Sequence, residues 1–73
     1  MIDANDISKA RKIIAEEIKS YTNQGITEIA TCRYLAKKYD CYWGALQKLS
    51  NQNLKSIKKS VETAEKILEK QND

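Results

Sequence analysis

The chain has 73 residues, which fits one small domain with a thin hydrophobic core. It has no Pro and no Phe, and it is rich in Ala, Ile, Leu, Lys, Glu and Gln, so the composition predicts an all-α fold. The formal net charge is +3, the sequence has no His for a zinc site, and no apolar run is long enough to cross a membrane.

The first predicted helix runs from about Ile7 to Tyr21, with Asp6 as its N-cap. Its apolar side chains recur at spacings of three and four residues and therefore share one face. Gly25 follows the polar stretch 22–24 and is predicted to end this element in a left-handed conformation. The members of the apolar face are Ile7, Ala10, Ile14, Ile18 and Tyr21, with Ile13 beside them.

A second helix is predicted from Glu28 to Tyr39, with Thr27 as its N-cap. A later start at Thr31, after a longer loop, also fits the sequence. Asp40 follows, and because Asp tolerates the left-handed region better than most residues, it is predicted to reverse the chain there. The predicted inner face of this helix consists of Ile29, Cys32, Leu35, Ala36 and Tyr39.

A third, short helix is predicted from about Trp43 to Ser50, after a turn at residues 40–42. Leu46 and Leu49 are its expected core residues. If they point inward, helical geometry places another set of side chains on the outer side. These outer residues are Trp43, Gly44, Gln47, Lys48 and Asn51.

Apolar residues continue at spacings of three and four after the polar stretch 51–53. Either one long helix or a break with Ser60 as the N-cap of a final helix fits this pattern, and the final helix ends near Lys70. The expected architecture is a compact domain of four to five helices. The stripe consists of Leu54, Ile57, Val61, Ala64 and Leu68, with Ile67 beside it.

The stretch from Cys32 to Asn51 resembles the helix-turn-helix of the lambdoid phage repressor and Cro (Xre-like) family. The likeness extends weakly to residues 60–68. The resemblance implies one helix-turn-helix domain over residues 1–73, which reads the major groove of double-stranded DNA with the helix at 43–50. The family usually has Gly at the turn, where this chain has Asp40, and often has Gln at the start of the motif, where this chain has Cys32. The matching positions are Leu35-Ala36, the turn at Asp40-Cys41, Leu46 and Leu49.

Basic residues are concentrated in the middle of the chain. Residues 31–60 hold seven Lys or Arg against one Asp, a net charge of +6, whereas residues 1–30 sum to −1 and residues 61–73 to −2. A clustered positive charge suits a polyanionic partner. The alternative is a solvated basic face without a partner.

Five residues at the start and on the outer side of the third helix are predicted to contact DNA for chemical reasons, and four more are predicted contacts. Gln47 is suited to adenine, and Lys48 to guanine or a phosphate. Tyr42 and Trp43 are expected to touch a thymine methyl group or the backbone, or else to pack in the core. Gly44 is expected to let the backbone approach the groove. The full predicted set is Arg33, Tyr42, Trp43, Gly44, Gln47, Lys48, Asn51, Lys55 and Lys58.

Doubled apolar positions at 13–14 and 67–68 suggest that one member of each pair faces a second subunit, which predicts a homodimer. A wide stripe in a monomer is the alternative. Cys32 and Cys41 are expected to be reduced thiols in a cytoplasmic protein. No cofactor or metal is expected, and the sequence offers no recognisable nucleophile, so an enzyme is not predicted.

These patterns favour a sequence-specific DNA-binding transcriptional regulator of bacterial, phage or plasmid type, such as a repressor. The alternative is a small phage-type inhibitor that binds a host protein, for example a polymerase or a defence nuclease complex. Tyr34, Tyr42 and Trp43 would then be the aromatic anchors. The lack of Arg on the reading helix favours this second interpretation.

Overall fold

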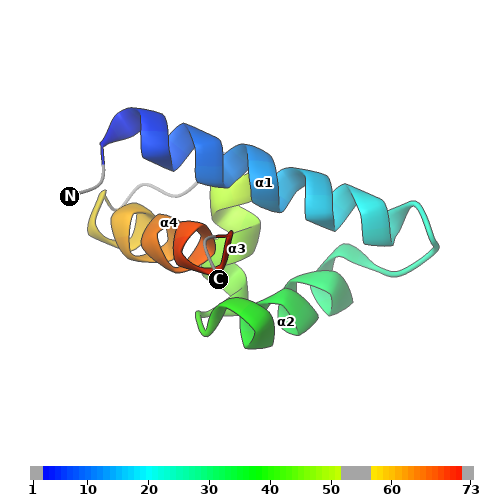
Figure 1. Ribbon diagram of the computed structural model, residues 1–73. Coiled ribbons are helices and arrows are strands. Elements are labelled where there is room, and N and C mark those ends of the chain that lie inside the picture. The colour runs from blue at the N-terminus through cyan, green and yellow to red at the C-terminus, as the bar shows by residue number, and fades with distance from the viewer. Residues whose placement is uncertain (1–2, 52–56, 72–73) are drawn as a thin grey trace.

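Four α-helices form the part of the chain that the computed structural model describes, residues 3–51 and 57–71 (Figure 1). The all-α prediction is confirmed, and these residues contain no β-strand. Helix α1 spans the domain, α4 and α2 lie along its two halves, and α3 lies between them. The helices are α1 (Ala4–Thr22), α2 (Glu28–Tyr39), α3 (Trp43–Ser50) and α4 (Ile57–Gln71).

Helix α1 begins earlier than predicted because Asp3, and not Asp6, is its N-cap. The Asp3 carboxylate accepts a hydrogen bond from the backbone N–H of Asp6 at 3.0 Å, and the Asp6 carboxylate accepts one from the N–H of Asp3 at 3.2 Å. This reciprocal capping box uses both aspartates. The left-handed conformation predicted for Gly25 is confirmed by its φ of 92°.

Helix α2 has the predicted bounds. The Thr27 hydroxyl accepts a hydrogen bond from the N–H of Ala30 at 3.2 Å, which caps the helix. The alternative start at Thr31 is wrong, since Thr31 lies inside the helix and is buried. Asp40 follows with φ 54° and ψ 55°, the left-handed conformation that the sequence predicts at the reversal.

The core lies where all four helices meet, and its members come mostly from the predicted stripes. Ile29 is an exception, because its side chain is 48% exposed. In the first turns of α2, Thr31 is the residue that points inward, so Ile29 lies at the edge of the buried face. The buried core residues are Ala10, Ile14, Ile18, Cys32, Leu35, Tyr39, Leu46, Leu49, Ala64 and Ile67.

Helix α4 is continuous through Ser60, so of the two predicted alternatives the break with Ser60 as an N-cap is wrong. Ser60 and Thr63 are buried within the helix, beside Ala64. The inward stripe of α4 therefore includes two small polar residues and is rotated relative to the predicted one. Leu54, the predicted start of the stripe, lies outside the described residues.

The doubled apolar positions are used within the chain itself. Ile14 and Ile67 are buried, and their neighbours Ile13 and Leu68 are partly buried against the same core. These pairs therefore leave no separate stripe for a second subunit, and they do not support the homodimer that the sequence predicted from them.

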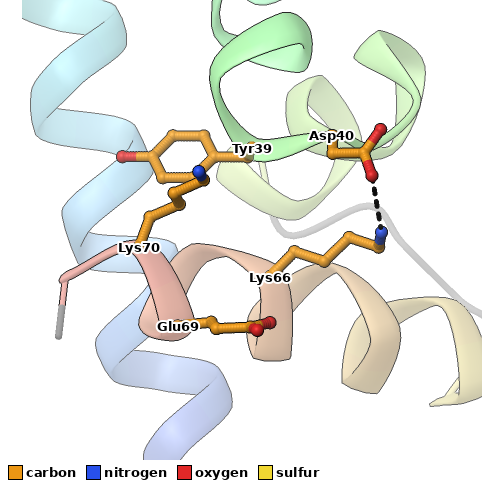
Figure 2. A pocket seen from close by; sticks show the side chains of 5 residues that line it. All are labelled: Tyr39, Asp40, Lys66, Glu69 and Lys70. Carbon is orange, nitrogen blue, oxygen red and sulfur yellow. Dashed lines mark ion pairs between the residues drawn. The ribbon is translucent and has the colours of Figure 1, made fainter. Parts of the chain in front are cut away.

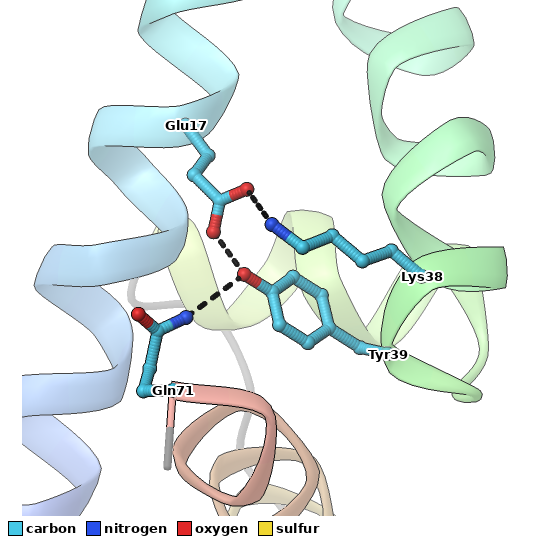
Figure 3. Close-up of polar contacts among 4 residues, drawn as sticks. All are labelled: Glu17, Lys38, Tyr39 and Gln71. Atoms are coloured by element: carbon cyan, nitrogen blue, oxygen red, sulfur yellow. Dashed lines mark hydrogen bonds and ion pairs between the residues drawn. The ribbon is translucent and has the colours of Figure 1, made fainter. Parts of the chain in front are cut away.

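A polar cluster joins α1, α2 and α4 (Figure 3). The Tyr39 hydroxyl donates to one carboxylate oxygen of Glu17, and Lys38 Nζ donates to the other at 3.0 Å. Gln71 Nε2 donates to the Tyr39 hydroxyl at 3.3 Å. The Tyr39 side chain thus reaches through the core and ends in hydrogen bonds, which ties the end of α2 to both other helices.

This cluster predicts a loss of stability at high pH. Burial, together with the bond to Glu17, raises the pKa of Tyr39 to about 12 from an ordinary value of 10.0. The unfolded chain therefore loses the Tyr39 proton near pH 10 while the folded chain keeps it, so stability falls as pH rises from about 10 to 12. At about 1.4 kcal/mol per pKa unit, the fall is about 2–3 kcal/mol.

Urea denaturation between pH 9 and 12 measures this fall. The hydrogen bond to Glu17 also raises the pKa of Lys38, which adds a loss in the same direction. Tyr39→Phe removes the tyrosine titration and should flatten the profile, although the variant starts less stable at neutral pH. Parallel profiles for the two proteins would contradict the assignment.

Candidate nucleic-acid interface

The inner side of α3 is fixed by two buried leucines and one arginine. Leu46 and Leu49 are both 0% exposed, which confirms their predicted inward orientation. Arg11 Nε of α1 donates to the backbone carbonyl of Leu49 at 3.1 Å, where the last carbonyls of α3 lack helical partners. The side of α3 that faces solvent is therefore set by contacts at both its middle and its end.

Tyr42 and Trp43 lie at the start of α3, next to Arg33 of α2. The Tyr42 side chain is 66% exposed, and Trp43 is partly buried against the core. The two ring centroids are 5.8 Å apart, and the Arg33 guanidinium lies 5.4 Å from the centroid of the Trp43 indole. Trp43 therefore packs partly against the core, as one of the two alternatives predicted, and its indole also makes a cation–π contact with Arg33. Its contact with DNA stays a prediction.

Gly44 does not have the role predicted for it. The residue is buried, and a Cβ added to it would lie 2.6 Å from Cε2 of Tyr42. The missing side chain therefore makes room for the Tyr42 ring and does not leave the backbone open to a groove. The Tyr42 ring covers the position that DNA was expected to approach.

The remaining predicted residues of α3 differ in their surroundings. Lys48 and Asn51 are exposed. Gln47 is half-buried, and its Nε2 donates to a carboxylate oxygen of Glu28 in α2 at 3.1 Å. Lys58 is exposed in the first turn of α4, and Lys55 lies outside the described residues.

The N-terminal turns of α3 and α4 share an electrostatic property. Neither contains an acidic residue. At the start of α3, moreover, the N-cap Tyr42 makes no side-chain capping hydrogen bond within the described structure. Both helix dipoles therefore present their positive ends without a carboxylate of their own.

A cleft of about 220 Å³ lies between α4 and the turn after α2 (Figure 2). Lys66 Nζ lies 3.6 Å from Asp40 Oδ2 across it, but the Asp40 side chain is 96% exposed. The Tyr39 hydroxyl points away from Asp40, toward α1. The acidic and hydroxyl groups of this cleft are therefore not arranged as an acid–base pair.

The two cysteines are free thiols. Burial raises the pKa of both, that of Cys32 to about 11, so both stay protonated at neutral pH. Within residues 3–51 and 57–71, His, Cys, Asp and Glu side chains form no group of three or more that would suit a metal ion.

An apolar groove of about 280 Å³ lies between the end of α1 and α2. Tyr34 is 57% exposed and Ile26 is 41% exposed on its walls. The rings of Tyr21 and Tyr34 meet edge to face, with centroids 5.6 Å apart. The sequence predicts Tyr34 as an aromatic anchor for a protein partner. It gives no signal for Ile26, because this residue lies in a loop, outside any apolar periodicity.

Comparisons with family models, with curated proteins and with solved structures find no match to this chain. The likeness to the lambdoid repressor and Cro family therefore stays a prediction from the residues. In the described part of the chain, none of the helices combines the length and apolar character needed to cross a membrane.

Proposed function

We propose that this chain is a small DNA-binding transcriptional regulator of bacterial, phage or plasmid type, in which α3 enters the major groove. The observation that carries the proposal is the orientation of α3. Leu46 and Leu49 are wholly buried beneath it, and Lys48 and Asn51 are exposed on its other side. In a helix-turn-helix, the second helix reads base edges from such an outer face.

The charge distribution supports the same surface. Lys58 is exposed in the first turn of α4, where a positive charge opposes the helix dipole by about 0.3–1 kcal/mol. A bound phosphate would offset this repulsion, because both the helix dipole and the Lys58 ammonium attract it. Arg33, Lys48 and Lys58, with Lys55, are therefore the proposed phosphate contacts, and the exposed Tyr42 ring is proposed to pack on the backbone.

Binding of an operator by this surface is proposed to compete with RNA polymerase, so that the chain acts as a repressor, in the cytoplasm. An eight-residue helix can touch few base pairs. Specific binding is therefore proposed to use two copies of the chain, on half-sites about one helical turn apart. This homodimer rests on the size of α3 and not on the doubled apolar positions.

Selection of duplexes from a randomised pool, followed by fluorescence anisotropy, tests the proposal. The wild-type chain should enrich a defined sequence, and Gln47→Ala should relax the preference at one position of each half-site. Gln24→Ala is a matched control, since it removes the same amide from the exposed turn after α1. Failure to bind duplex DNA at any salt concentration, or identical preferences in the Gln47 and Gln24 variants, would count against the proposal.

The second candidate is an inhibitor that binds a host protein, such as a polymerase or a defence nuclease complex. It is favoured by the apolar groove beside Ile26 and by the exposure of Tyr34 and Tyr42. Capture from a bacterial lysate after nuclease treatment separates the two candidates. A specific protein that stays bound to the wild type but not to Tyr34→Ser would support inhibition, whereas loss of all partners on nuclease treatment supports DNA binding.

A further inference from the structure

The side-chain amide of Gln47 is held by a carboxylate from the neighbouring helix. Gln47 Nε2 donates to Glu28 Oε2 at 3.1 Å, across the contact between α3 and α2. Both side chains are half-buried. Glu28 is also the first residue of α2, where the helix dipole favours a negative charge. The bond thus joins the proposed reading helix to a fixed point on the helix before it.

The chemistry of the two groups decides which way the amide faces. An ionised carboxylate accepts hydrogen bonds and donates none. The nitrogen of Gln47 must therefore face Glu28, because the reversed amide would set its oxygen Oε1 against a negative charge. A glutamine without such a partner can turn its amide over and present either arrangement. Gln47 keeps Oε1 and one N–H for a ligand.

On the premise of the proposed function, we infer that Glu28 is a positioning residue that makes Gln47 select adenine. In the major groove, adenine offers an N6 amino donor beside the N7 acceptor. The Oε1 atom and remaining N–H of Gln47 supply the complementary acceptor and donor.

The other bases fit this arrangement less well. Guanine presents two acceptors, N7 and O6, and Gln47 has only one N–H left for them. Thymine presents only the O4 acceptor, which can pair with the N–H of Gln47 but not with Oε1. Cytosine presents only an amino donor, which can pair with Oε1 but not with the N–H. The carboxylate of Glu28 also disfavours acceptor atoms nearby. Discrimination against guanine is therefore expected to depend on Glu28 as well as on Gln47.

The test compares the full-length wild type with Glu28→Gln, which keeps the size of the side chain and removes its charge. A glutamine at this position can also donate to Oε1, so the Gln47 amide is free to turn over. Glu16→Gln is the control, since it removes the same charge from an exposed site on α1. The probes are four duplexes that differ at one base pair only. This is the base pair at which Gln47→Ala loses the sequence preference of the wild type.

The wild type and Glu16→Gln should both bind the adenine duplex about tenfold more tightly than the guanine duplex. In Glu28→Gln this ratio should fall several-fold, with far-UV circular dichroism showing that the helices are intact. If that variant does not fold, Glu28→Asp keeps the charge, withdraws it by one methylene, and should also lower the ratio.

Two results separate the possible failures. An unchanged adenine-to-guanine ratio in a folded Glu28 variant, or a wild-type preference for guanine at this position, would overturn the inference while the proposed function stands. If the wild type binds no duplex at low salt, the proposed function fails and the inference fails with it.

Discussion

Leu49→Ala is expected to lower the free energy of unfolding by about 2–5 kcal/mol, the usual cost of removing a buried leucine side chain. Leu49 is 0% exposed and lies in the core shared by the four helices. A chain of 73 residues has a total stability of only about 4–11 kcal/mol, at about 0.05–0.15 kcal/mol per residue. The variant should therefore lose a large share of its total stability, and Leu46→Ala should behave similarly.

Ile29→Ala is the matched control for this prediction. It removes a side chain of the same size from a position that is 48% exposed, so the expected loss is below about 1 kcal/mol. Urea denaturation followed by far-UV circular dichroism measures both losses. Similar values for Leu49→Ala and Ile29→Ala would mean that α2 or α3 buries a different face.

Binding of duplex DNA is expected to weaken about 100-fold per protomer when salt rises from 50 to 200 mM. Four proposed phosphate contacts, Arg33, Lys48, Lys55 and Lys58, give a log-log slope of about −3.6 at about 0.9 for each phosphate neutralised. A dimer on two half-sites should show about twice that slope. Fluorescence anisotropy at several salt concentrations measures it.

Lys48→Gln should reduce the slope by about 0.9 per protomer and weaken binding of all sequences to a similar extent. Lys70→Gln is the control. It removes the same charge from the last turn of α4, at the other end of that helix from Lys58, and should leave the slope unchanged. If the two variants alter the slope equally, binding depends only on the net charge of the protein and not on where each lysine lies. The proposed surface would then be wrong.

Helices α2 and α3 could be predicted with their bounds because their signals are local. Thr27 caps α2 through an atom three residues away, and Asp40 adopts its left-handed conformation within the turn itself. The inward positions of Leu46 and Leu49 follow from the same short-range spacing. The predicted start of α1 was wrong, because Asp6 is not the N-cap but the third helical residue of a capping box in which Asp3 is the N-cap.

The errors arose where tertiary packing decides between local possibilities. Ser60 is an acceptable cap, but α4 buries it inside the helix against the core. Gly44 was assigned to DNA because helical geometry places it on the outer side of α3, but the Tyr42 ring folds over it. Ile29 was placed on the inner face of α2 because its spacing fits that face, but the way α2 packs leaves its side chain partly exposed.

The polar contacts between helices left no signal in the sequence. Glu28 and Gln47 are 19 residues apart, and Glu17 is 21 residues from Lys38. No periodicity within one helix connects such pairs, because the relative placement of the helices brings them together. The orientation of the Gln47 amide, on which the proposed base selection rests, therefore becomes visible only in three dimensions.

Whether α3 carries the contacts with DNA is tested most directly by NMR, in a titration of the ¹⁵N-labelled chain with a random-sequence duplex at low salt. The largest chemical-shift changes should fall on the backbone amides of Tyr42, Lys48, Asn51 and Lys58. Changes centred instead on the groove beside Ile26, or no changes at all, would contradict a DNA-reading role for α3.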